Sequence, residues 1–513
     1  MDIKDVIKGF EKPDRKYSAV AFWFWNDELD PDFLAWQIDE MVDKGVYGGF
    51  MHARAYLKTP YLEEDWWKAV DKCIARGREK GFYPWIYDEY AWPSGTAGST
   101  FEYGYQKPSR VLAEGEKNMA KGLYARKYTA GESINEENLL AKFPTDDGST
   151  LAFYRRVYPK SVDYLNKDTI RTFINYTHEE YKKRYKSDFG TIIPGVFFDE
   201  IYMIGYPLPW TDSLPEEFLA RCGYDLMKEL PHLLEGEDDH ARKVRRDYYR
   251  VISELYEEAF FKQISKWCTE NNLMLTGHTE EYLQSHPRRQ GNFFNTMRHL
   301  HIPGADNHDY RYRFPRKITF CEPKYSVSVA RAYNRERCMS EAMGGAGWGC
   351  SLQEFKRGIN TMGAMGINMF TLHGFYNECE HQGSQADWPT SFFYQNPYWK
   401  YFKTFGDYIS RICYMNTIGR PVVDNALYYP INELYEDMIQ GEANEHGKLM
   451  CQDFDMALNI LLCRQMDTDM IDYESLARAD IRGGKIEVGQ QSFSALICPT
   501  NMKIDEILAK KLR

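Results

Sequence analysis

Two glutamates stand where the chain could supply a pair of catalytic carboxylates. Glu200 ends the apolar run VFFDE, and Glu341 lies in CMSEAMGGAGWG, before glycines that keep side-chain bulk away from it. Hydrolysis of a glycosidic bond needs one carboxylic acid that protonates the leaving oxygen and a second carboxylate that attacks the anomeric carbon or activates water. We therefore predict that Glu200 and Glu341 are catalytic. The alternative for each is an acid that caps a helix or lies in a solvated loop.

The surroundings of the two glutamates differ in a way that suggests their roles. Glu200 ends an apolar strand and follows Asp199, and both burial and a neighbouring negative charge raise the pKa of a carboxyl group, as a general acid requires. Glu341 is followed by Ala342, Met343 and glycines, whose free backbone N–H groups could hold it ionised. We expect Glu200 to be the acid and Glu341 the base or nucleophile.

The elements that must position these residues form a repeating pattern. Eight short apolar runs alternate with amphipathic helical stretches, which is typical of repeated βα units. The runs cover residues 19–26, 46–52, 82–88, 192–200, 273–278, 301–306, 337–341 and 367–373. We predict an α/β fold, a (β/α)8 TIM barrel, with helices that include residues 63–81 and 168–185 and a closing helix at about 398–412.

Nearly every predicted strand ends in a polar or ionisable residue. Because the C-terminal ends of parallel barrel strands meet at one mouth, these residues and their neighbours should line one pocket, although polar residues also commonly follow strands simply because the chain enters solvent. The predicted substrate-binding residues are Asn26, His52, Asp88, Glu89, Trp92, Asp199, His278, Glu280, Asp306, Trp348 and His373. Trp23 and Trp25 are also expected at the mouth, where indole rings could stack on sugars or pack in the core.

Two pairs of acids could bind sugar hydroxyls, a hard cation such as calcium, or only solvent. They are Asp88–Glu89 and Glu280–Glu281. No HExxH spacing supports zinc at the three histidines His52, His278 and His373, and the metal ligands stay unassigned. No GxxxxGK[ST] motif occurs, and GGAGWG does not match a dinucleotide fingerprint, so we expect no organic cofactor.

The chain is too long for a barrel alone. We predict a catalytic barrel over residues 1–418, with an insertion of hairpin-like segments at about 100–165, and a flavodoxin-like α/β domain over 419–513. The second domain ends as a further helix begins, so we expect it to be incomplete at its C-terminus.

Composition limits the partners. The net charge of −11 argues against nucleic acid, and the 15% of aromatic residues suits a small-molecule or oligosaccharide substrate. No apolar run is long enough for a membrane helix, the first ten residues do not form a secretory leader, and 11 scattered cysteines fit reduced thiols. We expect a cytoplasmic protein that does not bind membranes; whether it forms a homo-oligomer stays open.

Five short motifs in residues 19–375 resemble the barrel-type α-L-rhamnosidases of glycoside hydrolase family 106. They are FWFWND (22–27), VYGGF (46–50), WPSG (92–95), GVFFDE (195–200) and MSEAMGG (339–345). The α/β unit after the barrel is similar, more distantly, to that of family 42 β-galactosidases. The resemblance implies an inverting, calcium-assisted exo-hydrolase with Glu200 as acid and Glu341 as base. The alternatives are a β-galactosidase-like retaining glycosidase and a non-catalytic carbohydrate-binding barrel.

Overall fold

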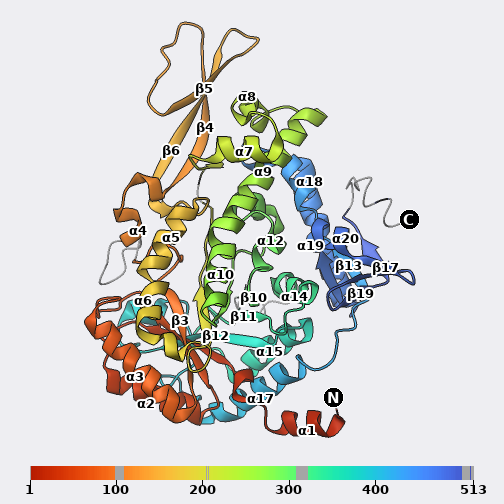
Figure 1. Cartoon of the computed structure of the whole chain (residues 1–513). Helices are drawn as coiled ribbons and strands as arrows, with labels where there is room; N and C mark the ends of the chain where they lie inside the picture. The colour runs from red at the N-terminus through yellow and green to blue at the C-terminus, as the bar shows by residue number, and fades with distance from the viewer. Residues whose placement is uncertain are drawn as a thin grey trace.

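Eight parallel strands close into a barrel, which lies in the lower half of the view in Figure 1. The structure is a computed structural model that describes residues 2–98, 109–203, 205, 207–307, 322–499 and 509. Each strand overlaps one of the eight predicted runs, so the predicted barrel is confirmed. The strands are β1 (Val20–Trp25), β2 (Gly48–Ala53), β3 (Tyr83–Tyr90), β7 (Gly195–Phe198), β9 (Met274–Gly277), β10 (Ile302–Asn307), β11 (Met339–Ala342) and β12 (Met369–Tyr376).

Alternation along the strands separates an interior face from an outer face. The interior holds a buried cluster that includes Phe22, Phe24 and Tyr87. Trp23 and Trp25 belong to the opposite face and are fully buried beneath helices, where the Trp23 Nε1–H donates to Gln37 at 2.6 Å. The expectation that these two indoles lie at the mouth is therefore wrong, because strand alternation turns both of them outward.

The helices that cover the barrel begin and end where local sequence dictates. α2 (Pro31–Asp43) starts behind Asp30, whose carboxylate accepts from the backbone N–H of Asp32, and α3 (Glu64–Lys80) ends at Gly81 in a left-handed conformation. α15 (Leu352–Met365) opens with a capping box. The later helices over the barrel are α10 (Gln263–Glu270), α14 (Glu322–Ala332) and α17 (Phe402–Met415).

The helix predicted over residues 168–185 is two helices, α5 (Lys167–Tyr176) and α6 (His178–Tyr185). Thr177 separates them with a backbone ψ of −75°. Its hydroxyl donates to the Phe173 carbonyl at 3.0 Å, and the hydroxyl oxygen lies 2.8 Å from His178 Nδ1. A hydroxyl that bonds its own backbone competes with helical hydrogen bonds, which apolar periodicity does not register.

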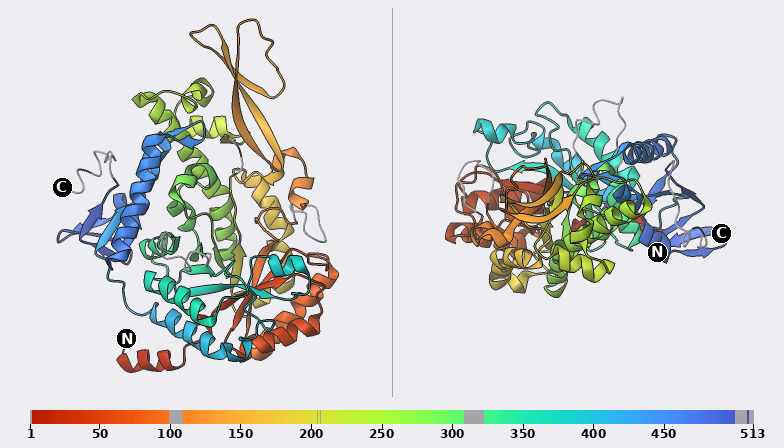
Figure 2. Two further views of the ribbon diagram at one scale, coloured as in Figure 1. Left: turned by 180° about the vertical axis from the view of Figure 1, so that it is seen from behind. Right: turned by 90° about the horizontal axis from the view of Figure 1, so that it is seen from above.

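Two extensions rise from the barrel. The predicted insertion contains β4 (Met119–Tyr128), β5 (Leu139–Pro144) and β6 (Thr150–Val162), which form an antiparallel sheet with β8 (Leu208–Trp210) and project away from the barrel (Figures 1 and 2). The second extension lies between β7 and β9 and was not predicted. It comprises α7 (Leu214–Cys222), α8 (Leu226–Glu229), the 3-10 turn η4 (Leu230–Leu233), α9 (Asp239–Tyr256) and the π-helical segment η5 (Glu257–Lys262) that joins α9 to α10.

The C-terminal part is α/β, as predicted. A parallel sheet has the order β16 (Thr468–Ile471), β13 (Asn425–Tyr428), β20 (Ala495–Ile497), and α18 (Ile431–Glu436), α19 (Glu445–Cys463) and α20 (Tyr473–Arg478) accompany it at one side of the barrel (Figure 2). A small antiparallel sheet, β17 (Asp480–Arg482), β18 (Lys485–Val488) and β19 (Gln491–Phe493), lies beside it. Three parallel strands do not establish a flavodoxin-like domain, so that assignment and the boundary at residue 419 stay predictions. Among the described residues, no helix combines the length and apolarity needed to span a bilayer.

Candidate active site

Six of the predicted site residues gather at the C-terminal end of the barrel. All of them belong to the interior face: His52 on β2, Asp306 on β10, Glu341 on β11, His373 on β12, Asp199 directly after β7 and His278 directly after β9. Asp306 lies beside Glu341 in the strand register, and all but the half-buried Asp306 are buried. The mouth therefore holds a layer of ionisable side chains contributed by six different strands, as barrel active sites do.

His278 is the centre of this layer. Its Nε2 lies 2.9 Å from Glu341 Oε2 and 3.3 Å from Asp199 Oδ1. Burial alone would lower the pKa of His278, but the two carboxylates raise it well above its usual value. The imidazolium form is thus favoured and fixes the carboxylates of Glu341 and Asp199 in space.

Glu341 also lies 3.8 Å, through Oε1, from Nε2 of His373. Burial raises the pKa of Glu341, and the positive charge of His278 acts in the opposite direction. A carboxylate that accepts a hydrogen bond from an imidazolium is ready to accept a proton from water or to stabilise positive charge at an anomeric carbon.

Glu200 lies where the chain leaves β7 and adopts a backbone φ of +40°. Non-glycine residues seldom occupy this region, and such strain concentrates at functional sites. Burial raises the pKa of Glu200 to about 7, with a further contribution from the charge of Asp199 and a smaller one from Glu341. A half-buried carboxyl group with this pKa can hold a proton near neutral pH and can donate it.

A second group of acids adjoins the layer. Glu281 is buried, and its Oε1 accepts the backbone N–H of Asp306 at 3.1 Å. Burial raises the pKa of both side chains well above the usual value. The charge of Asp306 adds to the shift of Glu281, and the charge of Glu341 adds to the shift of Asp306. The mouth therefore carries more acidic groups than bases to neutralise them.

Three residues at the mouth were missed by sequence reasoning. Arg54 forms a two-point ion pair with Asp387, and its NH1 lies 3.1 Å from His52 Nε2. The ring of His52 stacks on Tyr87 at 3.6 Å, and the Tyr87 hydroxyl donates to Asp199 Oδ2 at 2.7 Å. A continuous chain of contacts thus joins Asp387 to the carboxylates at the centre. Arg54 could have been found, because it lies two residues after His52 and so shares its face.

Asp88 and Glu89 do not lie in the mouth, contrary to the prediction. Asp88 points to the outer face, where it accepts from the Ser94 hydroxyl at 2.6 Å and lies 3.8 Å from His178 of α6. Glu89 is completely buried, and both of its oxygens accept backbone N–H groups of the loop at residues 95–98. Both side chains are fully buried, so neither carboxylate is available to a substrate. Their role in this structure is to hold the loop after β3.

The remaining predicted residues lie at the rim. The Asn26 amide exchanges two hydrogen bonds with the backbone of Glu378, which fixes a loop. Glu280 pairs with Arg289 at 3.1 Å outside the central layer. Trp348 is 39% exposed, and its indole N–H donates to the Gln385 carbonyl.

Aromatic rings border a cavity on the same side of the barrel. Its volume is about 220 Å³, and its walls include Tyr56, Trp92 and Trp388. Arg54 covers one face of Trp92 with its guanidinium carbon 4.1 Å from the ring centroid. Aromatic walls next to a charged layer suit a sugar, which has both apolar C–H faces and hydroxyls.

Two donor sets at the mouth could hold a cation. Donor atoms of Asp199, His278 and Glu341 all lie within 4.8 Å of one another, but this set contains an imidazole nitrogen, whereas calcium takes oxygen ligands. Glu281 and Asp306 offer only oxygen, and the charge of Asp306 adds to the effect of burial in raising the pKa of Glu281. Oxygen donors are the kind that calcium takes.

Comparison with known proteins gives this geometry its context. The family model for glycoside hydrolase family 106, described as alpha-L-rhamnosidase, matches residues 159–477, which is more than half of the chain. The chain belongs to this family. It is a glycoside hydrolase, and its substrate is a carbohydrate. The resemblance found in the sequence is thereby confirmed.

Solved structures share the fold of this family 106 member. A rhamnosidase from Novosphingobium sp. PP1Y matches with a TM-score of 0.70 at 14% identity, over 99% of this chain and 68% of that chain. β-Galactosidases from the psychrophilic Marinomonas ef1 and from Bacillus circulans sp. alkalophilus match with TM-scores of 0.61 and 0.55, both at 10% identity. The first alignment covers 96% of this chain and 74% of the other, and the second covers 88% and 65%. No curated protein sequence matches the chain.

Proposed function

We propose that this enzyme removes terminal α-L-rhamnose residues, with Glu200 as general acid and Glu341 as general base. The observation that carries the proposal is the contrast between the surroundings of two carboxyl groups: burial and the charge of Asp199 raise the pKa of Glu200 to about 7, whereas at Glu341 the hydrogen-bonded His278 imidazolium opposes the effect of burial. Environments that separate two carboxyl groups in this way are how acid and base roles are divided.

In this mechanism Glu200 gives its proton to the glycosidic oxygen as the bond from that oxygen to the anomeric carbon breaks. Glu341 takes a proton from a water molecule whose oxygen bonds to the same carbon from the opposite face. The sugar leaves with inverted configuration, and Glu200 and Glu341 return to their starting states by exchanging protons with solvent. His278 and Tyr87 orient Glu341 and Asp199 through the hydrogen bonds described above.

A panel of nitrophenyl glycosides tests the substrate. We expect turnover of the α-L-rhamnoside to exceed that of every other glycoside, including the β-D-galactoside. NMR of the first-formed sugar should show the β anomer, as inversion requires. Faster hydrolysis of the β-D-galactoside would contradict the proposed substrate, and retention of configuration would make Glu341 a nucleophile.

We also propose that calcium binds at Glu281 and Asp306. There it would neutralise the two acids and offer coordination sites to sugar hydroxyls. Activity should fall after treatment with EDTA and return with calcium, and Glu281→Gln should raise the calcium concentration needed for half-maximal activity. Rates that stay unchanged after exhaustive chelation would remove the metal from the mechanism.

A further inference from the structure

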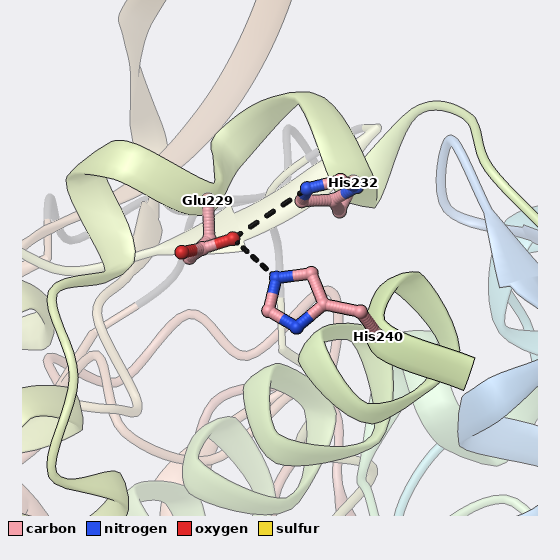
Figure 3. Close-up of side chains that lie close together, drawn as sticks. All are labelled: Glu229, His232 and His240. Carbon is pink, nitrogen blue, oxygen red and sulfur yellow. Dashed lines mark hydrogen bonds and ion pairs between the residues drawn. The ribbon is translucent and has the colours of Figure 1, made fainter. Parts of the chain in front are cut away.

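Glu229, His232 and His240 converge at the end of the α7–α9 extension that points away from the barrel (Figures 1 and 3). Glu229 ends α8, His232 lies in η4, and His240 lies in the first turn of α9. Glu229 Oε2 is 2.8 Å from His240 Nε2 and 3.5 Å from His232 Nε2. The two imidazole rings meet edge to face, with their centroids 4.9 Å apart.

These distances fit the coordination shell of a small divalent cation. Zinc binds imidazole nitrogen and carboxylate oxygen at about 2.0–2.2 Å, so the donors of a tetrahedral site lie roughly 3.3 Å from one another. The separations of 2.8 and 3.5 Å fall on either side of that value, and all three donor atoms lie within 4.8 Å of one another. Small rotations of partly exposed side chains would complete the shell.

The backbone that carries His232 is held rigidly. Arg245 is almost completely buried and donates to the carbonyls of His232 and Gly236, and also to that of Glu436 in α18. The backbone N–H of Gln440 donates to the Leu233 carbonyl at 3.0 Å. A ligand turn fixed in this way loses little conformational entropy when a metal binds.

We propose that Glu229, His232 and His240 form a binding site for a divalent transition metal of the zinc class, which links η4 to the first turn of α9. Two imidazoles and one carboxylate suit zinc, nickel or copper and not calcium, which takes oxygen ligands. The site uses residues of a single extension and takes no part in the reaction at the mouth.

Zinc titration of chelator-stripped protein tests the site, with a chromophoric chelator as competitor. The proteins compared are the wild type, His232→Ala, His240→Ala and, as a matched control, His446→Ala, which removes another partly exposed histidine paired with an acid. We expect the wild type and the control to bind one more equivalent of zinc than the two variants of the site, or to bind it at least about tenfold more tightly, since even outer-shell groups change affinity 10–100-fold. Calcium should not compete.

The readout is zinc bound per chain and not activity, so failure of the proposed rhamnosidase reaction would not affect it. The four proteins keep Asp199, His278 and Glu341, so any zinc at the mouth cancels in the comparison. Circular dichroism checks that the variants are folded, and the partial exposure of His232 and His240 makes large structural damage unexpected. Equal zinc binding by all four proteins, in amount and affinity, would overturn the proposal.

Discussion

The mouth of the barrel and the contact between α14 and the C-terminal sheet both bury charged side chains, but they balance charge differently. At the contact, Lys324 pairs with Asp467 and Asp469, and Arg331 and Gln491 complete the shell of Asp469. Burial would raise the pKa of Asp469, yet the two cations bring it well below its usual value. At the mouth, the pKa of Glu200, Asp306 and Glu341 is raised.

The difference indicates that the charged residues at the contact stabilise the fold, whereas those at the mouth serve catalysis. At the contact Lys324 and Arg331 both pair with Asp469, so the ionised form of Asp469 is stable near neutral pH. At the mouth Arg54 is already paired with Asp387, which leaves His278 to serve several acids. Glu200, which has no cation of its own, keeps a proton that it can release to a substrate, whereas Glu341 accepts a hydrogen bond from His278.

The strongest test of this contrast is Glu341→Gln. An amide cannot accept a proton from water, so turnover should fall by at least about 100-fold on every substrate while the circular dichroism spectrum stays unchanged. Steady-state rates with an aryl rhamnoside and a rhamnose-containing disaccharide provide the measurement. Near wild-type rates on either substrate would show that Glu341 is not the base.

Glu200→Gln should lower turnover as strongly as Glu341→Gln does, but only for substrates with a poor leaving group. A natural disaccharide needs protonation of its leaving oxygen and should lose about 100-fold or more, whereas a dinitrophenyl glycoside, with a good leaving group, should be largely spared. The ratio of the two losses is the readout. If Glu341→Gln gave the selective pattern and Glu200→Gln the general one, the acid and base roles would be exchanged.

Removal of a buried cation from the contact should affect stability and not catalysis. Lys324→Met leaves the buried Asp469 with one cation fewer, and we expect the free energy of unfolding to fall by about 3 kcal/mol, with turnover per folded molecule unchanged. The exposed pair of Lys448 and Glu445 supplies a control, since Lys448→Met should change the free energy by less than about 0.5 kcal/mol. Equal effects in denaturant titrations would contradict the distinction.

The dependence of rate on pH should show the proton held by Glu200. Its pKa is raised to about 7, so the acid is protonated below that pH and loses its proton above it, and kcat/KM for the disaccharide should fall on the alkaline side with a midpoint near 7. The dinitrophenyl glycoside should show a weaker alkaline decline. An identical decline for both substrates would assign it to another group.

The smallest effect is expected for Asp88→Asn. Burial raises the pKa of Asp88 well above its usual value, and the side chain lies on the outer face of the barrel, so an amide of the same shape should leave kcat within about threefold. Asp199→Asn is the matched comparison at the mouth, where misplacement of His278 should cost about 10–100-fold. Equal losses would place Asp88 in the catalytic machinery.

Much of the fold was accessible from sequence because each barrel strand is a short apolar run with its own following helix. The acids of the mouth were also accessible, since they end those runs. The predictions were wrong where the direction of a side chain decided its place. Asp88, Trp23 and Trp25 each lie one position along a strand from a residue whose side chain points into the barrel, so their own side chains point outward. Asp387 could not be found, because only the closed barrel brings the loop after β12 next to Arg54, directly after β2.

The α7–α9 extension was missed for a related reason. Its helices lie between β7 and β9 and read as ordinary amphipathic stretches, so periodicity could not show that most of them stand above the barrel. Likewise, the break at Thr177 depends on one hydroxyl group. Local pattern specifies the repeating units, and long-range contacts specify how the additions are arranged.

The left-handed backbone of Glu200 implies a conflict between two selective pressures. Glycine or asparagine would occupy that conformation at lower cost, so random substitution toward either residue should make the folded protein more stable. Only the requirement for a proton donor at position 200 opposes the replacement of glutamate by glycine or asparagine. A library of variants at position 200, sorted once for thermal resistance and once for activity, should therefore enrich different amino acids, glycine or asparagine in the first sort and glutamate in the second.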